Sequence, residues 1–236
     1  MNNLIILTTA TPRPELHAIG LLETIEVLIK ERTQNKIYWY VNIDKPKMFN
    51  KQEVKQTINQ INNFAKEKTE ELSVFIFSDH KEAHAGAAAR RLYTEIAKSR
   101  PFEQGNEVFF WFEDDWALTN KGSFVKAVGN FFETSQDVLL CTWQKYISGH
   151  PFLFRRDFFD VITDKYKVVK RNTDPELFLF DCVKDYYMTS LKRLKQPLYN
   201  QKNLFEDIGR KWREDRSIGK TNKYEAKQHN FTWFLE

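Results

Sequence analysis

Short apolar runs alternate with segments of helical periodicity through the first half of the sequence, and this alternation constrains the fold more than any other feature. Four runs are rich in β-branched and aromatic residues, as expected of strands buried on both faces of a sheet. They cover residues 4–8, 36–43, 72–77 and 108–112, and apolar side chains recur at helical spacing in residues 16–31, 52–68 and 83–98 between them. Four strands joined by three helices predict parallel crossovers in an α/β sheet.

The second half is less regular and predicts shorter elements. Helical patterns cover residues 122–132, 155–162 and about 176–191, a strand is expected at 138–143, and a short helix is expected at 205–213. No Gly/Ser-rich or Pro-rich linker separates the halves. We therefore expect residues 1–236 to form a single α/β domain with a mixed, mostly parallel central sheet flanked by helices.

Composition excludes some classes of protein and leaves others open. Hydrophobic residues make up 42% of the chain and aromatic residues 15%, which excludes a disordered chain. Residues 184–227 hold 12 Lys and Arg against 6 Asp and Glu. Such a basic segment suits nucleic acid, an anionic membrane surface or a phosphate-bearing ligand, but a solvated helical surface would look the same.

The cysteines and the hydropathy pattern bear on where the protein works. Cys141 and Cys182 stand in apolar surroundings and form no metal-binding motif, so buried free thiols are expected. No stretch approaches the roughly 20 apolar residues of a membrane span, and the N-terminal apolar run is too short for a signal peptide. These features predict a cytoplasmic protein without a transmembrane segment.

Three consecutive carboxylates, Glu113, Asp114 and Asp115, directly follow the fourth apolar run. Ligands of α/β sheets bind beyond the carboxyl ends of the strands, where this triplet is expected. Adjacent carboxylates repel one another unless a cation or hydrogen bonds compensate, and oxygen ligands suit Mg²⁺ or Mn²⁺. The alternative is a solvated acidic turn.

The triplet resembles the DxD region of GT-A glycosyltransferases, in which an apolar strand ends in acidic residues that hold a divalent cation. Three further segments are similar to parts of that family: the loop Thr8-Thr9-Ala10-Thr11-Pro12-Arg13-Pro14, the small-residue helix start Ala85-Gly86-Ala87-Ala88-Ala89-Arg90-Arg91, and Ser148-Gly149-His150-Pro151-Phe152-Leu153-Phe154-Arg155-Arg156 on the acceptor side. The four segments span roughly residues 4–160. Glu113 departs from the usual first Asp of the motif.

The resemblance implies a nucleotide-sugar-dependent glycosyltransferase of the hexosyltransferase class, with residues 1–116 as the nucleotide-sugar-binding half and 117–236 as the acceptor half. It implies Mn²⁺ or Mg²⁺ as cofactor, a UDP- or GDP-sugar donor with UDP favoured, and a glycan or other hydroxyl acceptor. Asp115 is the expected metal ligand, whereas Glu113 could touch the metal, act through water or contact the sugar. The other expected donor contacts are Thr8, Thr9, Arg13, Asp44, Arg90 and Asp114.

The resemblance also assigns roles in the second half. An inverting enzyme needs a carboxylate that takes the proton of the acceptor hydroxyl. Asp174 is the first candidate and Glu176 the second, although Asp174 fits a helix N-cap equally well. Lys220 and Lys223 are expected to bind donor phosphate, and His229 to complete the metal shell unless it is a surface histidine.

Two other functions remain as alternatives. A sugar nucleotidyltransferase uses a similar sheet with Mg²⁺, but it usually has a Gly-rich phosphate loop after the first strand, and residues 9–14 contain no glycine. A nucleic-acid-binding protein without catalysis ranks third, because the chain shows no known binding module and no dense Lys/Arg stripe. We therefore expect no nucleic-acid partner.

Overall fold

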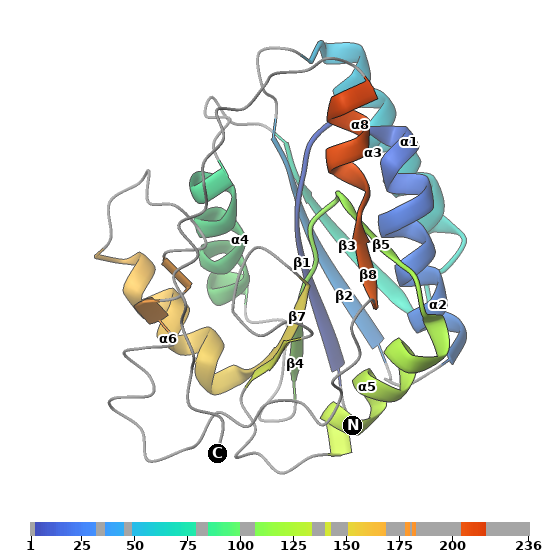
Figure 1. Cartoon of the computed structure of the whole chain (residues 1–236). Coiled ribbons are helices and arrows are strands. Elements are labelled where there is room, and N and C mark those ends of the chain that lie inside the picture. The colour runs from blue at the N-terminus through green and yellow to red at the C-terminus, as the bar shows by residue number, and fades with distance from the viewer. Residues whose placement is uncertain are drawn as a thin grey trace.

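The computed structural model describes residues 3–31, 36–44, 49–78, 85–99, 107–133, 140–142, 151–168, 178–179, 181–182 and 204–215. These residues form a six-stranded sheet in the order β3-β2-β1-β4-β7-β6 (Figure 1). Its first four strands in that order run parallel, and β7 and β6 complete it with antiparallel pairings. The bounds are β1 (Asn3–Ala10), β2 (Lys36–Ile43), β3 (Leu72–Phe77), β4 (Val108–Trp111), β6 (Leu140–Thr142) and β7 (Phe152–Arg155).

Helices cover both faces of this sheet. On one face lie α2 (Glu23–Glu31), α3 (Lys51–Lys66) and α5 (Lys121–Glu133); on the other lie α4 (Ala85–Ser99) and α6 (Arg156–Tyr166) (Figure 1). Side chains of a strand alternate between the faces, so Leu4 and Ile6 of β1 enter one core while Ile5 and Leu7 enter the other. The chain is thus a three-layer α/β domain.

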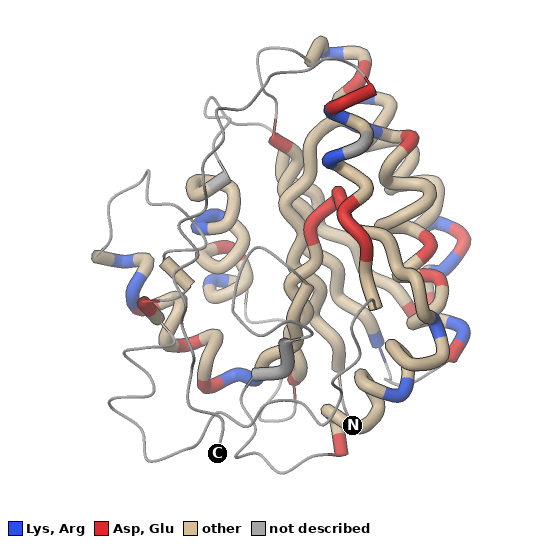
Figure 2. Tube along the Cα trace, viewed as in Figure 1, with Lys and Arg blue, Asp and Glu red and all other residues tan. Residues whose placement is uncertain are grey.

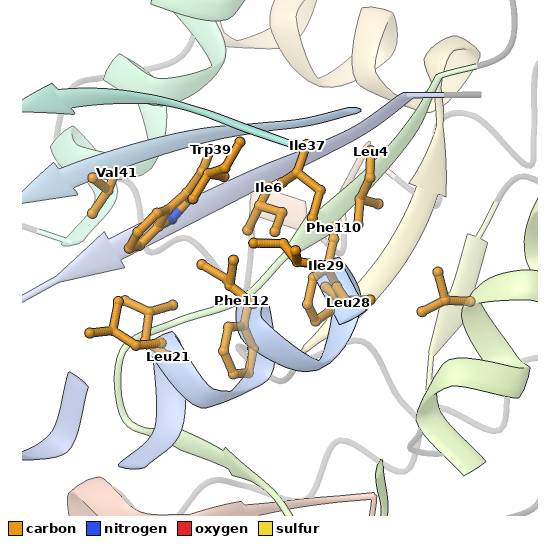
Figure 3. Packing of buried hydrophobic residues seen from close by; sticks show 14 of the residues in the cluster. Leu4, Ile6, Leu21, Leu28, Ile29, Ile37, Trp39, Val41, Phe110 and Phe112 are labelled. Atoms are coloured by element: carbon orange, nitrogen blue, oxygen red, sulfur yellow. The ribbon is translucent and has the colours of Figure 1, made fainter. Parts of the chain in front are cut away.

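The sheet is almost free of charge, because both of its faces are buried. β1, β3 and β4 contain no charged residue, and the Lys, Arg, Asp and Glu of the described chain lie mainly on helices and at strand ends (Figure 2). On the α2 face, Leu4, Ile6, Ile37 and Phe110 of the strands meet Leu28 (Figure 3). Contiguous apolar strands are what a sheet covered on both sides requires.

The predicted helix at 16–31 has a π-helical turn inside it. It consists of α1 (Pro14–His17), the π turn η1 (Ala18–Leu22) and α2. The wider turn shifts the phase of the following side chains. Ile19, which the helical spacing assigned to the buried face, is therefore 54% exposed, and Gly20 enters the core instead. A Cβ atom on Gly20 would lie 2.4 Å from the carbonyl oxygen of Trp116, so the π turn brings helix backbone directly onto that residue.

A second, two-stranded sheet joins distant parts of the chain. β5 (Trp116–Leu118) follows the acidic triplet and pairs antiparallel with β8 (Phe205–Asp207), which leads into α8 (Ile208–Asp215). The prediction of a helix from residue 205 was therefore wrong for its first three residues. Asp207 Oδ1 accepts a hydrogen bond from the backbone N–H of Arg210, so the helix begins after the strand with Asp207 as its cap.

The other predicted strands and helices of the described residues are confirmed within a few residues of their ends. Cys182 is buried and is not part of a disulfide, as expected. Among the described helices, none is long and apolar enough to cross a membrane. The predicted helix at 176–191 lies mostly outside the described residues.

Candidate active site at the carboxyl edge of the sheet

Backbone hydrogen bonds bring the polar ends of three neighbouring strands together. The N–H of Asp114 donates to the carbonyl of Thr9 over 3.3 Å, and the N–H of Asp44 donates to the carbonyl of Ala10 over 2.7 Å. The segment after β4 thus continues beside β1, which in turn continues beside β2. Thr9, Asp44 and the acidic triplet therefore lie along one edge of the sheet, as predicted for the carboxyl ends of parallel strands.

Asp114 lies at the centre of a buried ionic cluster. Arg13 donates two hydrogen bonds to its carboxylate, from Nη2 to Oδ1 over 2.7 Å and from Nε to Oδ2 over 3.2 Å. Oδ2 also contacts His17 Nε2 at 3.1 Å and accepts bonds from the backbone N–H and the hydroxyl of Thr11. Both partners of the Arg13–Asp114 pair are almost fully buried.

The cluster compensates the cost of burying Asp114. Burial alone would raise the pKa of this carboxyl group, but Arg13 and His17 outweigh it and hold the pKa well below its usual range. Because its partners come from the 11–13 loop and from α1, Asp114 fastens the loop after β1 onto the end of β4. The predicted contacts of Arg13 and Asp114 with the donor stay predictions; in the structure the two side chains bind each other.

Asp115 is more accessible to solvent than Asp114, and 21% of its side chain is exposed. Its Oδ2 lies 3.4 Å from Arg213 Nη1 of α8 and 3.9 Å from Arg13 Nη2. Its backbone carbonyl accepts bonds from the N–H groups of Ile208 and Gly209, which fixes its position. Burial and the neighbouring charge of Asp114 raise the pKa of Asp115 to about 6 despite both arginines.

β8 adds a further acidic residue to this neighbourhood. Trp116 pairs with Asp207, and the charge of Asp207 contributes to the raised pKa of Asp115. Figure 2 shows acidic segments of the tube side by side where the acidic triplet enters β5 and where β8 runs into α8. The acidic residues Glu206 and Asp207 of β8 therefore lie beside the segment that follows the acidic triplet.

The two threonines at the end of β1 have different positions. Thr9 donates from its hydroxyl to Glu113 Oε1 over 3.4 Å, which places both at the candidate site. Thr8 is 0% exposed, and its hydroxyl accepts a bond from Trp39 Nε1 over 3.0 Å. The side chain of Thr8 is therefore part of the core and is not available for the predicted donor contact.

Asp44 is buried at the end of β2. Its Oδ1 accepts a bond from Asn42 Nδ2 over 3.0 Å, and burial raises its pKa to about 6 although that bond and the charge of Arg91 act in the opposite direction. Arg91 Nη1 also lies 3.4 Å from Asn42 Oδ1. Arg90 acts electrostatically on Tyr166, and its predicted donor contact stays a prediction; Arg91 is the arginine of α4 that acts on Asp44.

The chemistry of the edge fits a divalent cation. Mg²⁺ and Mn²⁺ are commonly held by one or two carboxylates, with water and substrate phosphate in the other positions. Asp115 and Glu113 supply that number, and Asp115 is partly exposed. The described residues contain no group of three or more His, Cys, Asp and Glu side chains arranged to hold a metal, so a protein-only cage is not formed among them.

Several predicted residues lie outside the described part of the chain. These are the candidate bases Asp174 and Glu176, the phosphate-binding Lys220 and Lys223, and the metal ligand His229. Of the acceptor-side segment, Phe152 to Phe154 form part of β7, and Ser148 to His150 are not described.

Three residues of the site were missed in the sequence: His17, Arg91 and Arg213. His17 stands four residues after Arg13, a separation that places two side chains on one side of a helix. Arg213 carries no local signal, because its place depends on the pairing of β8 with β5.

Comparisons with known proteins bear on the fold. No family model and no curated protein matches the sequence. A cytidylyltransferase from Leptospira borgpetersenii serovar Hardjo-bovis has a similar structure, with 13% identity, a TM-score of 0.53, and coverage of 91% of this chain and 85% of its own. At that identity the similarity shows a shared fold, and it confirms the predicted single α/β domain with a mixed, mostly parallel sheet.

Other solved structures match at lower scores. The mannosyltransferase PcManGT from Pyrobaculum calidifontis, in complex with GDP-Man and Mn²⁺, has 12% identity and a TM-score of 0.44 over 66% of this chain. This chain spans only 45% of its length. A glycosyltransferase involved in glycosylation of the major capsid of PBCV-1 has 15% identity and a TM-score of 0.43, with coverage of 78% of this chain and 76% of its own.

Proposed function

We propose that this chain is a metal-dependent glycosyltransferase, which moves a sugar from a nucleotide-diphosphate donor to a hydroxyl acceptor. One observation carries the proposal: Asp115, a partly exposed carboxylate two residues after Glu113, is fixed at the carboxyl edge of the sheet within reach of Arg213. Ligands of α/β sheets bind at this edge. The charge arrangement suits a ligand that brings both a cation and phosphate oxygens.

Four described residues of the edge, with two that support them, have roles in the proposal. Asp115 and Glu113 hold Mn²⁺ or Mg²⁺, which when bound neutralises charge on the leaving diphosphate. Asp44, supported by Asn42 and faced by Arg91, contacts the base of the donor. Thr9 orients Glu113 through its hydroxyl group.

The remaining roles rest on the resemblance to GT-A enzymes. Asp174, or Glu176 in its place, takes the proton of the acceptor hydroxyl. Lys220 and Lys223 bind phosphate, and His229 completes the metal shell. A UDP-sugar is the favoured donor and a glycan the favoured acceptor.

The loop after β1 supports glycosyl transfer over nucleotidyl transfer. A nucleotidyltransferase needs this loop to grip a triphosphate with basic side chains and free N–H groups. Here Arg13 is 5% exposed and bonded to Asp114, and the N–H of Thr11 donates to the same carboxylate. Nucleotidyl transfer remains the second candidate, because its substrates would occupy the same edge.

A binding screen tests the proposal directly. UDP-, GDP-, TDP- and CMP-sugars are titrated calorimetrically into the protein with Mn²⁺ and then with a chelator. We expect one donor class to bind with Mn²⁺, and chelation or Asp115→Ala to abolish binding. Asp164→Ala, an exposed carboxylate on α6, is the matched control and should bind normally. Failure of every nucleotide sugar to bind, or unaltered binding by the Asp115 variant, would refute the proposal.

A second assay separates the two enzyme classes. The protein is incubated with nucleoside triphosphates, hexose 1-phosphates and Mg²⁺, and released diphosphate is measured. A glycosyltransferase releases none under these conditions, whereas a sugar nucleotidyltransferase does.

A further inference from the structure

Asp115 is faced by two arginines, but only one of them is free of a closer partner among the described contacts. Arg13 Nη2 lies 3.9 Å from Asp115 Oδ2 and 2.7 Å from Asp114 Oδ1, so Arg13 interacts mainly with Asp114. Arg213 Nη1 lies 3.4 Å from Asp115 Oδ2, and this is the contact described for its guanidinium. Arg213 is thus the counter-ion of Asp115.

The contact between Arg213 and Asp115 is loose and open to water. Charge-assisted hydrogen bonds between nitrogen and oxygen are usually about 2.7–2.9 Å long, clearly shorter than this one. The Arg213 side chain is 38% exposed. The Arg213 side of this long contact is screened by water, so the pair contributes little to stability and another cation can replace Arg213 at a small cost.

The helix that carries Arg213 is held in place by other residues. Trp212 Nε1 donates to Glu15 Oε1 over 2.7 Å, and its ring stacks on Phe49 with centroids 6.2 Å apart. The N–H groups of Ile208 and Gly209 bond to the carbonyl of Asp115. Movement of the Arg213 guanidinium away from Asp115 therefore leaves α8 seated against α1 and β5 (Figure 1).

We propose that Arg213 is an exchangeable counter-ion of Asp115, which competes with a divalent cation for Oδ2 and, once displaced, binds the diphosphate of the donor. The guanidinium group suits phosphate because its planar donors can bond two oxygens at once. The phosphate half of this inference rests on the proposed glycosyltransferase function. The competition for Asp115 does not.

The competition is tested with Mn²⁺ alone, followed by electron paramagnetic resonance of the free ion. Arg213→Gln removes the competing charge, so its affinity for Mn²⁺ without nucleotide should rise several-fold above that of the unaltered protein. Arg210→Gln is the matched control: it removes an arginine from the same helix whose described side-chain contact is with Asp207, and Mn²⁺ affinity should stay closer to the unaltered value.

The phosphate role is tested with UDP and GDP at saturating Mn²⁺. Loss of a charged hydrogen bond should weaken binding of whichever nucleotide binds by about tenfold in Arg213→Gln, and Arg213→Lys should restore part of the loss. A purely structural Arg213 would not move the two affinities in opposite directions.

The outcomes separate the two proposals. If the unaltered protein binds Mn²⁺ and nucleotide while Arg213→Gln changes neither affinity, the exchange is refuted and the proposed function stands. Weaker Mn²⁺ binding by Arg213→Gln also refutes the exchange. If the unaltered protein binds no nucleotide, the proposed function and the phosphate role fail together, and the Mn²⁺ titration alone decides on the competition.

Discussion

Gly209 lies so close to Asp115 that a Cβ atom on Gly209 would fall 2.3 Å from the Cβ atom of Asp115 and 2.7 Å from Oδ2. No side chain larger than hydrogen fits there without movement of the carboxylate or of α8. Gly20 makes a similar approach to the backbone of the next residue, Trp116. Gly20 and Gly209, which are far apart in the sequence, thus pack closely against Trp116 and Asp115 respectively.

Gly209→Ala should disturb both stability and the metal site. Overpacking usually costs about 1–3 kcal/mol, which here exceeds the gain of up to about 1 kcal/mol from replacing a helical glycine. We expect a lower free energy of unfolding in urea and weaker Mn²⁺ binding. Gly122→Ala on α5 is the control, because nothing lies within 4 Å of its Cβ position, and stability should be unchanged or slightly higher.

Asp114→Asn should destabilise the fold strongly. The substitution leaves the buried Arg13 guanidinium without its closest anionic partner, and breaking a buried pair costs about 3–5 kcal/mol. Urea unfolding of this variant is compared with Asp164→Asn, which removes an exposed pair with Lys167. That control should cost less than about 1 kcal/mol. Equal losses in the two variants would contradict a stabilising role for the cluster.

The raised pKa of Asp44 predicts a fall in stability with rising pH. The folded protein keeps the proton up to about pH 6, whereas the unfolded chain loses it near the ordinary value of 3.8. Between these values the folded state binds more protons, so the free energy of unfolding falls as pH rises through the window. The raised pKa of Asp115 also makes the free energy of unfolding fall as pH rises. The lowered pKa of Asp114 makes the free energy of unfolding rise with pH, in a lower pH range.

Asp44→Asn isolates the contribution of Asp44. Urea unfolding is measured at intervals across the pH range between those two values, and the variant should show a shallower fall than the unaltered protein. An unchanged slope would show that Asp44 has no raised pKa.

Arg91→Gln should weaken nucleoside diphosphate binding more than Arg90→Gln. Arg91 lies beside Asn42 and acts on Asp44, the proposed base contact, whereas Arg90 acts on Tyr166. We expect about a tenfold loss for Arg91→Gln by calorimetry, as for a charged hydrogen bond. Lys98→Gln, at the exposed end of α4, serves as the control. A larger loss in the Arg90 variant would favour Arg90 as the donor contact.

The main sheet and its helices could be predicted because they depend on local patterns. A strand buried on both faces must be apolar along its whole length, as in residues 108–112, and a covering helix must repeat its apolar residues every turn. The candidate edge then followed from the general position of ligands in α/β sheets. Asp44, Thr9 and the acidic triplet could therefore be placed together from the order of strands and helices alone.

The rest of the site depends on contacts that leave no local pattern. β5 and β8 have three residues each, too few to show a period, and they pair across a long separation in sequence. Arg90 and Arg91 are neighbours in the sequence and point to different sides of α4. The periodicity of residues 83–98 does not determine how α4 is rotated against β2, so it does not tell which arginine faces Asp44. The π turn that exposes Ile19 is likewise decided by the close approach of Gly20 to Trp116.

The pairing of β5 with β8 also sets an order of events during synthesis. A ribosome adds about 5–20 residues per second, and about 90 residues separate the end of β5 from the start of β8. A nascent chain can complete β1 to β4 while its acidic triplet still lacks the partner strand and Arg213. For some seconds, the emerging protein therefore presents Asp115 to solvent or to a chaperone without the segment that later contacts it.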